Sequence, residues 1–244
     1  IADVSYFVKE GSELDLLAFK KSTSIYLPQK VLPMLPPVLS EDMCSLKEGQ
    51  DRYSYVFKMY LDVQNQSVKK SELFEAIIKS HKNFSYGRID RVIEGHLDQY
   101  SKIEKEIFDY LIPFYEISKK FRAKRLLKGY DFRTSENRLK LRNSKLESIE
   151  VETSTSSHQL VEECMLLANI EASKKVNTVG IYRIHEEPAF KAISKLVDDV
   201  NILGVNAKLQ SDVHETILHI QQKAKIAMLS AEIDELIIQS QTQA

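Results

Sequence analysis

A run of cations stands out among the residues that could bind a charged ligand. Six lysine and arginine side chains fall within the ten residues from Lys119 to Lys128. On a helix they would cover most of the exposed surface, and Lys124, Arg125 and Lys128 could then contact the phosphates of a nucleic acid. The same run fits a solvated helix end, where cations favour the negative end of the helix dipole. Composition alone favours this second interpretation.

Carboxylates and histidines are the other candidates for chemistry. Glu162 and Glu163 lie near the expected N-terminus of a helix, where interaction with the helix dipole explains them without catalysis. Asn169 and His185 are residue types that more often serve as structural hydrogen-bond partners than as ligands. The six histidines show no spacing typical of metal ligands. These residues therefore define no site by themselves.

Composition limits the classes of protein to which the chain can belong. Its 244 residues are enough for one large domain or two small ones, and 43% hydrophobic with 28% charged residues is typical of a soluble protein with a core. Cys44 and Cys164 lie far apart without a CxxC spacing, so we expect reduced thiols in a reducing compartment, and neither a disulfide nor a zinc site. No run of about eighteen apolar residues occurs, which argues against a membrane span.

Hydrophobic periodicity predicts strands and helices in the N-terminal half. The apolar start predicts a strand over 1–8, and Ser12 begins a helical pattern that runs to about Lys21. Clean alternation over 53–61 predicts a strand with one buried face. Residues 68–80 are its expected partner, joined through a hairpin turn.

The C-terminal half is predominantly helical by the same criteria. Apolar residues at three- and four-residue steps predict a helix over 103–121, which Pro113 either kinks or divides. Ser156 and Gln159 form a capping-box pattern ahead of a second helix, and three amphipathic helices follow Pro188. Two further stretches alternate as strands do, 137–151 and 180–185. The fold class is α+β, most simply one domain with a helical tail.

Three local sequences are unusual in composition and spacing. They are Tyr26-Leu27-Pro28 with Pro33-Met34-Leu35-Pro36, Arg125 to Phe132, and Ser157 to Asn169 with Tyr182-Arg183-Ile184-His185-Glu186. Their order and spacing resemble the RNB catalytic domain of the ribonuclease II/ribonuclease R family, and within it the bacterial ribonuclease R group. The resemblance implies a mixed or antiparallel sheet packed by several helices, with 1–188 as the central part of the domain and 189–244 as its helical continuation.

The resemblance implies an activity and a set of site residues. Members of this family degrade single-stranded RNA processively from the 3′ end to nucleoside 5′-monophosphates, using magnesium held by aspartates. Tyr26 corresponds to a tyrosine that stacks near the 3′-terminal nucleotides, and Phe132 to an aromatic clamp at the channel entrance. Without the surrounding motifs, both would be interpreted as packing residues. The remaining residues that the resemblance implies are Lys124, Arg125 and Lys128 as RNA contacts, and Glu162, Glu163, Asn169, Arg183 and His185 as residues that line or support the channel.

The resemblance also implies the binding partners of the protein and its location in the cell. Single-stranded RNA is the expected partner, proteins of RNA decay are candidate partners, no membrane is involved, and the location is cytoplasmic.

Two departures from the family pattern bear on the expected activity. The family's D-x5-D-x-D-D cluster, which would hold magnesium, does not occur in this sequence, and neither does its Thr-Ser-Pro-Ile-Arg-Arg string. We therefore expect the chain by itself to be inactive.

Two hypotheses from different classes remain open. In the first, the chain is the middle of the catalytic domain of an exoribonuclease. In the second, it is a catalytically dead relative that binds RNA or a protein partner. An apolar start at Ile1 and an end within a predicted helix favour the first.

Overall fold

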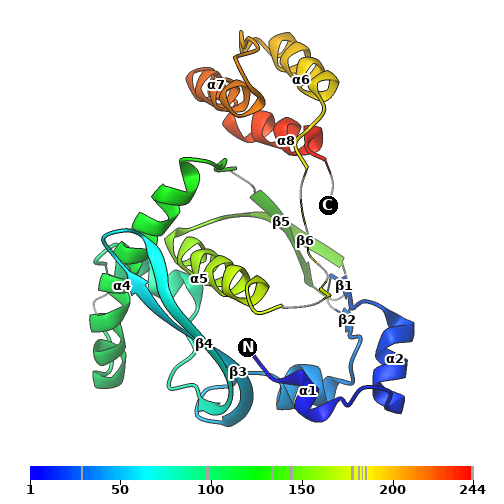
Figure 1. The fold of residues 1–244 in the computed structure, drawn as a ribbon, viewed down its shortest axis with the longest axis vertical. Helices are drawn as coiled ribbons and strands as arrows, with labels where there is room; N and C mark the ends of the chain where they lie inside the picture. Colours follow the sequence, from blue (N-terminus) through cyan, green and yellow to red (C-terminus); the bar gives the residue numbers. More distant parts are fainter. Residues whose placement is uncertain are drawn as a thin grey trace. The chain divides into compact units, whose positions relative to one another are not determined.

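The computed structural model is an α+β fold, as the sequence predicted, and its elements are drawn in Figure 1. It describes residues 1–28, 30–96, 99–132, 135–142, 145–176, 179–180, 182, 184 and 186–242. The chain forms two compact units, one of residues 1–117 with 138–150 and the other of residues 118–137 with 151–244. The predicted division at residue 188 concerned segments of one catalytic domain, and these spatial units do not test it. Within the described residues, no helix has both the length and the apolar character needed to cross a membrane.

The start of the first unit differs from the predicted strand. Residues Val4–Phe7 form a short helix, α1, and only Ala2 makes an isolated bridge, to Ser54. The reason is local, because the Asp3 carboxylate accepts hydrogen bonds from the Tyr6 backbone N–H at 3.1 Å and from the Ser5 hydroxyl at 2.6 Å. An aspartate that captures nearby donors in this way favours a helix start over an extended chain. The predicted strand over 1–8 was therefore wrong.

The predicted helix from Ser12 to about Lys21 is confirmed, and three elements that were not predicted follow it. Helix α2 covers Glu13–Lys21, and the Ser12 side chain accepts from the Asp15 backbone N–H. Strands β1 (Ile25–Leu27) and β2 (Lys30–Leu32) then pair antiparallel. A π-helical turn, η1, covers Val38–Met43.

A long hairpin forms the largest sheet of the first unit. Strands β3 (Asp51–Asp62) and β4 (Ser67–Lys79) pair antiparallel, which confirms the predicted partners. The Asp62 carboxylate accepts from the backbone N–H groups of Gln64 and Asn65, each at 3.1 Å, and so closes the turn. The described strands form three separate two-stranded sheets instead of one continuous sheet, and the third pairs β5 (Ser135–Arg142) with β6 (Lys145–Thr153).

Helix α4 connects the two units. It covers Lys102–Leu126 and includes Pro113, so the predicted helix is confirmed and continues through the proline. Its start is fixed by a reciprocal pair, because the Glu104 carboxylate accepts from the Ser101 backbone N–H at 2.8 Å and the Ser101 hydroxyl accepts from the Glu104 N–H at 3.3 Å. Arg88, on helix α3 (Tyr86–Ile93), donates to the same carboxylate at 2.9 Å.

Helix α5 is the first helix in the longer segment of the second unit, residues 151–244. It covers Ser156–Ser173, as predicted, but its capping box is formed by Thr155 and His158, one residue before the predicted Ser156 and Gln159. The shift follows from the extended backbone of Thr155, whose hydroxyl lies where it can accept from the first turn. The predicted strand over 180–185 depends on Ile181, Arg183 and His185, which lie outside the described residues.

Three helices after Pro188 form the apolar core of the second unit. They are α6 (Phe190–Ile202), α7 (Val213–Ile226) and α8 (Ser230–Ser240), and they confirm the three predicted amphipathic helices. Their side chains meet at helical spacing, which removes several branched residues almost completely from water. The innermost are Ile193, Val200, Ile217, Ile220, Ile233 and Ile237.

The hydrogen bonds to Glu104 predict a pH-dependent contribution to stability. The Ser101 backbone N–H and then the Arg88 guanidinium lower the pKa of Glu104 from 4.5 to about 2. Because the folded pKa is depressed, this contribution is fully present above the unfolded pKa and is lost as the pH falls from about 4.5 to about 2. We expect Glu104→Gln to lower the thermal unfolding midpoint at neutral pH, by an amount that shrinks across that window. Glu106→Gln, at an exposed position of the same helix, is the control; equal losses in both variants at every pH would contradict the assignment.

Candidate nucleic-acid interface

Two arginines from the end of α4 meet two glutamates from the second turn of α5. Arg122 and Arg125 are three residues apart and therefore share one face of α4. Arg122 Nη1 donates to Glu162 Oε2 at 3.0 Å and lies 3.4 Å from Glu163 Oε1. Arg125 donates to Glu163 Oε1 from Nη2 at 2.5 Å and from Nε at 3.2 Å. The end of the basic run is therefore joined to α5 by charge-assisted hydrogen bonds.

Glu163 is the buried member of this network. Only 4% of it is exposed, whereas the side chain of Glu162 is 48% exposed. A carboxylate removed from water needs both charge compensation and hydrogen bonds, and Glu163 receives them from the two guanidinium groups. The favourable dipole position at a helix N-terminus therefore does not account fully for Glu163.

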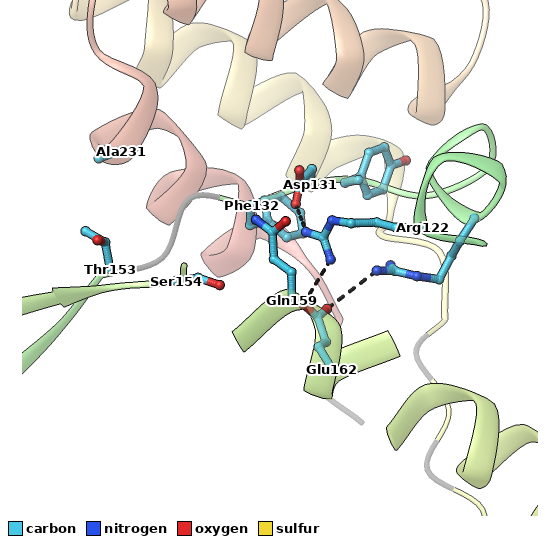
Figure 2. A pocket seen from close by; sticks show the side chains of 10 residues that line it. Arg122, Asp131, Phe132, Thr153, Ser154, Gln159, Glu162 and Ala231 are labelled. Carbon is cyan, nitrogen blue, oxygen red and sulfur yellow. Dashed lines mark hydrogen bonds and ion pairs between the residues drawn. The ribbon is translucent and has the colours of Figure 1, made fainter. Parts of the chain in front are cut away.

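Asp131 adds a third carboxylate to the network. Arg122 Nη2 donates to its Oδ1 at 2.5 Å, and Figure 2 shows Asp131 and Glu162 converging on this arginine. Burial opposes the charge of Arg122, but Asp131, Glu162 and Glu163 together outweigh it and raise the pKa of the guanidinium above its usual value. Three carboxylates face two guanidinium groups, so the network carries one negative charge in excess.

The aromatic rings of Tyr130 and Phe132 lie on either side of Asp131 in the sequence. Both are partly buried and pack against the core of α6, α7 and α8. Their ring centroids are 5.8 Å apart, and the Tyr130 ring lies 5.0 Å from the imidazole of His214 on α7. The segment 130–132 is therefore held by apolar packing as well as by the charge of Asp131.

A pocket of about 760 Å³ opens beside this network, within the second unit. Its wall combines cations, carboxylates, aromatic rings and neutral polar groups, and Figure 2 shows their side chains. Such a mixture can hold a ligand that carries both an anionic group and a flat ring. The lining residues are Arg122, Arg125, Tyr130, Asp131, Phe132, Thr153, Ser154, Gln159, Glu162 and Ala231.

Several predicted site residues meet at this pocket. Phe132, Arg125 and Glu162 line it. Glu163 is not part of the lining but is bound to Arg125, which is. The basic side chains of Lys124 and Lys128 are exposed to solvent and are not part of the lining. Their assignment as RNA contacts stays a prediction.

Other predicted residues are not brought to the pocket. Asn169, near the C-terminal end of α5, is exposed and does not line it. Tyr26, on β1 of the first unit, is 78% exposed, so its ring is available for stacking. Arg183 and His185 lie outside the described residues.

Sequence reasoning missed part of the pocket. Arg122 was counted in the basic run but not selected, although it contacts Asp131, Glu162 and Glu163. Asp131 was seen only as part of the motif that ends in Phe132, and Gln159 only as a capping residue. The available signal was the three-residue spacing of Arg122 and Arg125, which predicts a shared helical face but not the acidic partners about forty residues away.

The carboxylates of the pocket do not fit a magnesium site. Mg²⁺ requires several oxygen ligands arranged around a shared position, whereas Asp131, Glu162 and Glu163 are all turned toward arginines. Within the described ranges, no group of three or more histidine, cysteine, aspartate or glutamate side chains is arranged to hold a metal. Cys44 and Cys164 are both free, and burial raises the pKa of each thiol, which keeps them protonated.

The network predicts unequal roles for the two neighbouring glutamates. Glu163→Gln would leave two partly buried guanidinium groups without their buried counter-charge, and we expect it to lower the free energy of unfolding by about 1–3 kcal/mol. Glu162→Gln is the matched control, with an expected loss of about 0–1 kcal/mol because its pair is half exposed. Urea unfolding followed by circular dichroism measures both. Similar losses for the two variants would show that burial of Glu163 does not organise the network.

Comparison with known proteins relates this geometry to a family. The model of the RNB domain family matches residues 1–244. Ribonuclease R of Helicobacter pylori (strain ATCC 700392 / 26695) is 32% identical over 249 residues, which cover 100% of this chain and 38% of that protein. Ribonuclease R of Thermotoga maritima is 33% identical over 252 residues, again covering 100% of this chain and 35% of that protein. The chain thus spans less than two fifths of the length of these relatives.

A solved structure supports the same relationship. Mycoplasma genitalium RNase R in complex with ribose methylated single-stranded RNA superposes with a TM-score of 0.85 at 25% sequence identity. The match covers 98% of this chain and 38% of that one. The family model and the sequence relatives match the whole sequence and the fold matches 98% of it, and the chain belongs to the RNB domain family.

Proposed function

We propose that the chain acts in the degradation of RNA, as part of a ribonuclease R-type exoribonuclease, and that the pocket of the second unit contacts single-stranded RNA. The observation that carries this proposal is the position of Phe132 and Tyr130 beside the paired arginines Arg122 and Arg125 in one pocket. The relationship to ribonuclease R proteins, one of which was solved with single-stranded RNA, supports the choice of ligand.

The aromatic rings supply the sequence-tolerant part of recognition. Every nucleobase has a π-face, so stacking on Phe132 binds any base, and it contributes about 1–3 kcal/mol per base in single-strand binding proteins. An enzyme that moves along RNA from the 3′ end needs contacts of this kind, because each step presents a different base. Tyr26, with its exposed ring on β1, takes a similar stacking role near the 3′-terminal nucleotides in this proposal.

The arginines supply the contact with phosphate, in competition with carboxylates of the pocket. Glu162 and Asp131 are about half exposed, at 48% and 54% of their side chains, so their ion pairs with Arg122 are weak in water. A phosphate can replace Glu162 on Arg122, because guanidinium groups bind carboxylates and phosphates in the same forked geometry. Glu163 stays bound to Arg125 because it is buried, and it keeps the pocket in shape during this exchange. Lys124 and Lys128 add exposed positive charge next to the pocket.

The family resemblance extends the proposal to a processive 3′-to-5′ hydrolysis that yields nucleoside 5′-monophosphates. In that chemistry magnesium would polarise the scissile phosphate and activate water. The carboxylates of this pocket are bound to arginines and do not fit the ion, so we propose that the chain alone binds RNA without cleaving it. The proposal includes a cytoplasmic location and proteins of RNA decay as partners of the complete enzyme.

A catalytically dead RNB-like protein is the second candidate. The sequence contains no D-x5-D-x-D-D pattern, which is compatible with this candidate, because a hydrolase of this type needs clustered carboxylates for its metal. In this case the pocket would serve RNA binding, or binding of a protein partner, as its only function. The two candidates predict different results when the flanking segments of a complete ribonuclease R are added to this chain. The first predicts that RNA cleavage is restored, and the second predicts that it is not.

Removal of the Phe132 ring tests the RNA-binding role of the pocket. We expect Phe132→Ala to weaken binding of a 5′-labelled single-stranded oligoribonucleotide roughly 5- to 150-fold, which corresponds to the stacking energy of one base. Phe190→Ala, at an aromatic residue that is 72% exposed on α6, is the control and should bind as the parent does. Fluorescence anisotropy measures both affinities, and circular dichroism confirms that both variants are folded. Equal affinities for all three proteins would reject the pocket as the RNA site.

Incubation with labelled RNA tests the inactivity of the chain. We expect no trimming of single-stranded RNA by the purified protein, either with magnesium or with a chelator, because the pocket does not fit the metal. A complete bacterial ribonuclease R in the same buffer is the positive control. Magnesium-dependent trimming by this chain would show that its own residues provide the metal site, and the proposed inactivity would be wrong.

A further inference from the structure

The backbone of Asp131 is held by a glutamine from α7, a residue ninety positions later in the chain. Gln221 Nε2 donates to the Asp131 carbonyl oxygen at 3.1 Å. The same nitrogen donates to Asp234 Oδ1 on α8 at 2.7 Å. One side chain therefore connects the segment that carries Phe132 with two helices of the apolar core.

The chemistry of the partners fixes the orientation of the Gln221 amide. A backbone carbonyl and a carboxylate are both acceptors, so only the NH₂ end of the amide can face them, and its two protons allow both bonds at once. Asp234 is only 4% exposed, and a buried carboxylate needs donors. Gln221 meets this need with the same group that holds Asp131.

Asp131 is thus fixed at two points, one on its side chain and one on its peptide group. Its carboxylate is bound by Arg122 of α4 at 2.5 Å, and its carbonyl oxygen by Gln221 of α7. A residue held by both its side chain and its peptide group has little freedom left in φ and ψ, and these dihedral angles set the direction in which the next side chain leaves the chain. That next side chain is Phe132, which lines the pocket.

We propose that Gln221 is a positioning residue for Phe132: by holding the carbonyl oxygen of Asp131, it orients the aromatic ring for stacking on a base of single-stranded RNA. The inference rests on the proposed role of the pocket in RNA binding. Gln221 itself contacts no RNA in this proposal. Its amide acts through the Asp131 peptide group, and α7 and α8 thereby set the geometry of the pocket wall.

A single tryptophan makes this proposal measurable. The chain contains no tryptophan, so Phe132→Trp introduces one fluorescent reporter at the position of interest. In that background, Gln221→Met keeps the length of the side chain but removes the donors, and Gln221→Glu keeps the shape but places an acceptor against two acceptors. Gln222→Met, at the exposed neighbouring position of α7, is the matched control. Acrylamide quenching reports the exposure of the indole, and quenching by a single-stranded oligoribonucleotide reports stacking.

We expect both Gln221 variants to increase acrylamide quenching and to weaken RNA-induced quenching, with a larger effect for Gln221→Glu. The loss of RNA affinity should be roughly 2- to 12-fold for Gln221→Met, which corresponds to about 0.5–1.5 kcal/mol for one hydrogen bond. Gln222→Met should match the parent in both measurements. Unchanged quenching by acrylamide and by RNA in Gln221→Met would overturn the inference. If Gln221→Glu does not fold, as thermal unfolding will show, Gln221→Met decides the question.

The design separates failure of the inference from failure of the proposed function. If RNA does not quench the tryptophan of the parent reporter, stacking at residue 132 is wrong. Acrylamide quenching then still measures whether Gln221 fixes the position of that side chain. If RNA quenches the parent reporter and both Gln221 variants equally, RNA binding at the pocket stands and the role of Gln221 is rejected.

Discussion

A carboxylate that is almost completely removed from water must be neutralised where it lies, and Glu163 is such a carboxylate in the second unit. The two arginines that neutralise it come from the end of α4, so the burial of one charge determines how α4 and α5 are joined. The desolvation cost of a buried ion pair is recovered only with good geometry and additional hydrogen bonds. Arg125 provides two hydrogen bonds from different nitrogens, and Arg122 extends the network to carboxylates that remain in contact with water.

The difference in burial between the carboxylates gives the pocket both rigidity and the capacity to exchange ligands. Glu163 is bound in a protected environment, where breaking its ion pairs is costly. Glu162 and Asp131 neutralise Arg122 at the surface, where water and salt weaken the attraction. In the proposed function, an incoming phosphate therefore competes with the Glu162 pair. In this proposal, Arg122 takes part in the ion-pair network when RNA is absent and contacts the RNA backbone when it is bound.

Elements whose pattern is local could be predicted from the sequence, and contacts between distant residues could not. Alternation predicted the β3–β4 hairpin, and three- and four-residue steps predicted α4 and the three C-terminal helices. The strand expected over 1–8 failed because two hydrogen bonds to Asp3 outweigh the propensity of its apolar neighbours. Arg122 shows the other limit. Its sequence neighbours mark it as one cation among six, whereas its role depends on glutamates of α5 that the fold brings close to the end of α4.

The family resemblance identified Phe132 and Arg125, but it did not explain how they are supported. The support comes from two helices and from two kinds of interaction. The Arg122 guanidinium of α4 binds the Asp131 carboxylate as an ion pair, and the neutral amide of Gln221 on α7 donates to the Asp131 carbonyl oxygen. Tyr130 and Phe132 then pack on the core of α6, α7 and α8, whose apolar residues show no sign of chemistry in the sequence. A helical segment that composition presents as a structural tail therefore contributes to the pocket wall through Ala231, and in our proposal the backbone that it holds determines where the Phe132 ring can meet a base.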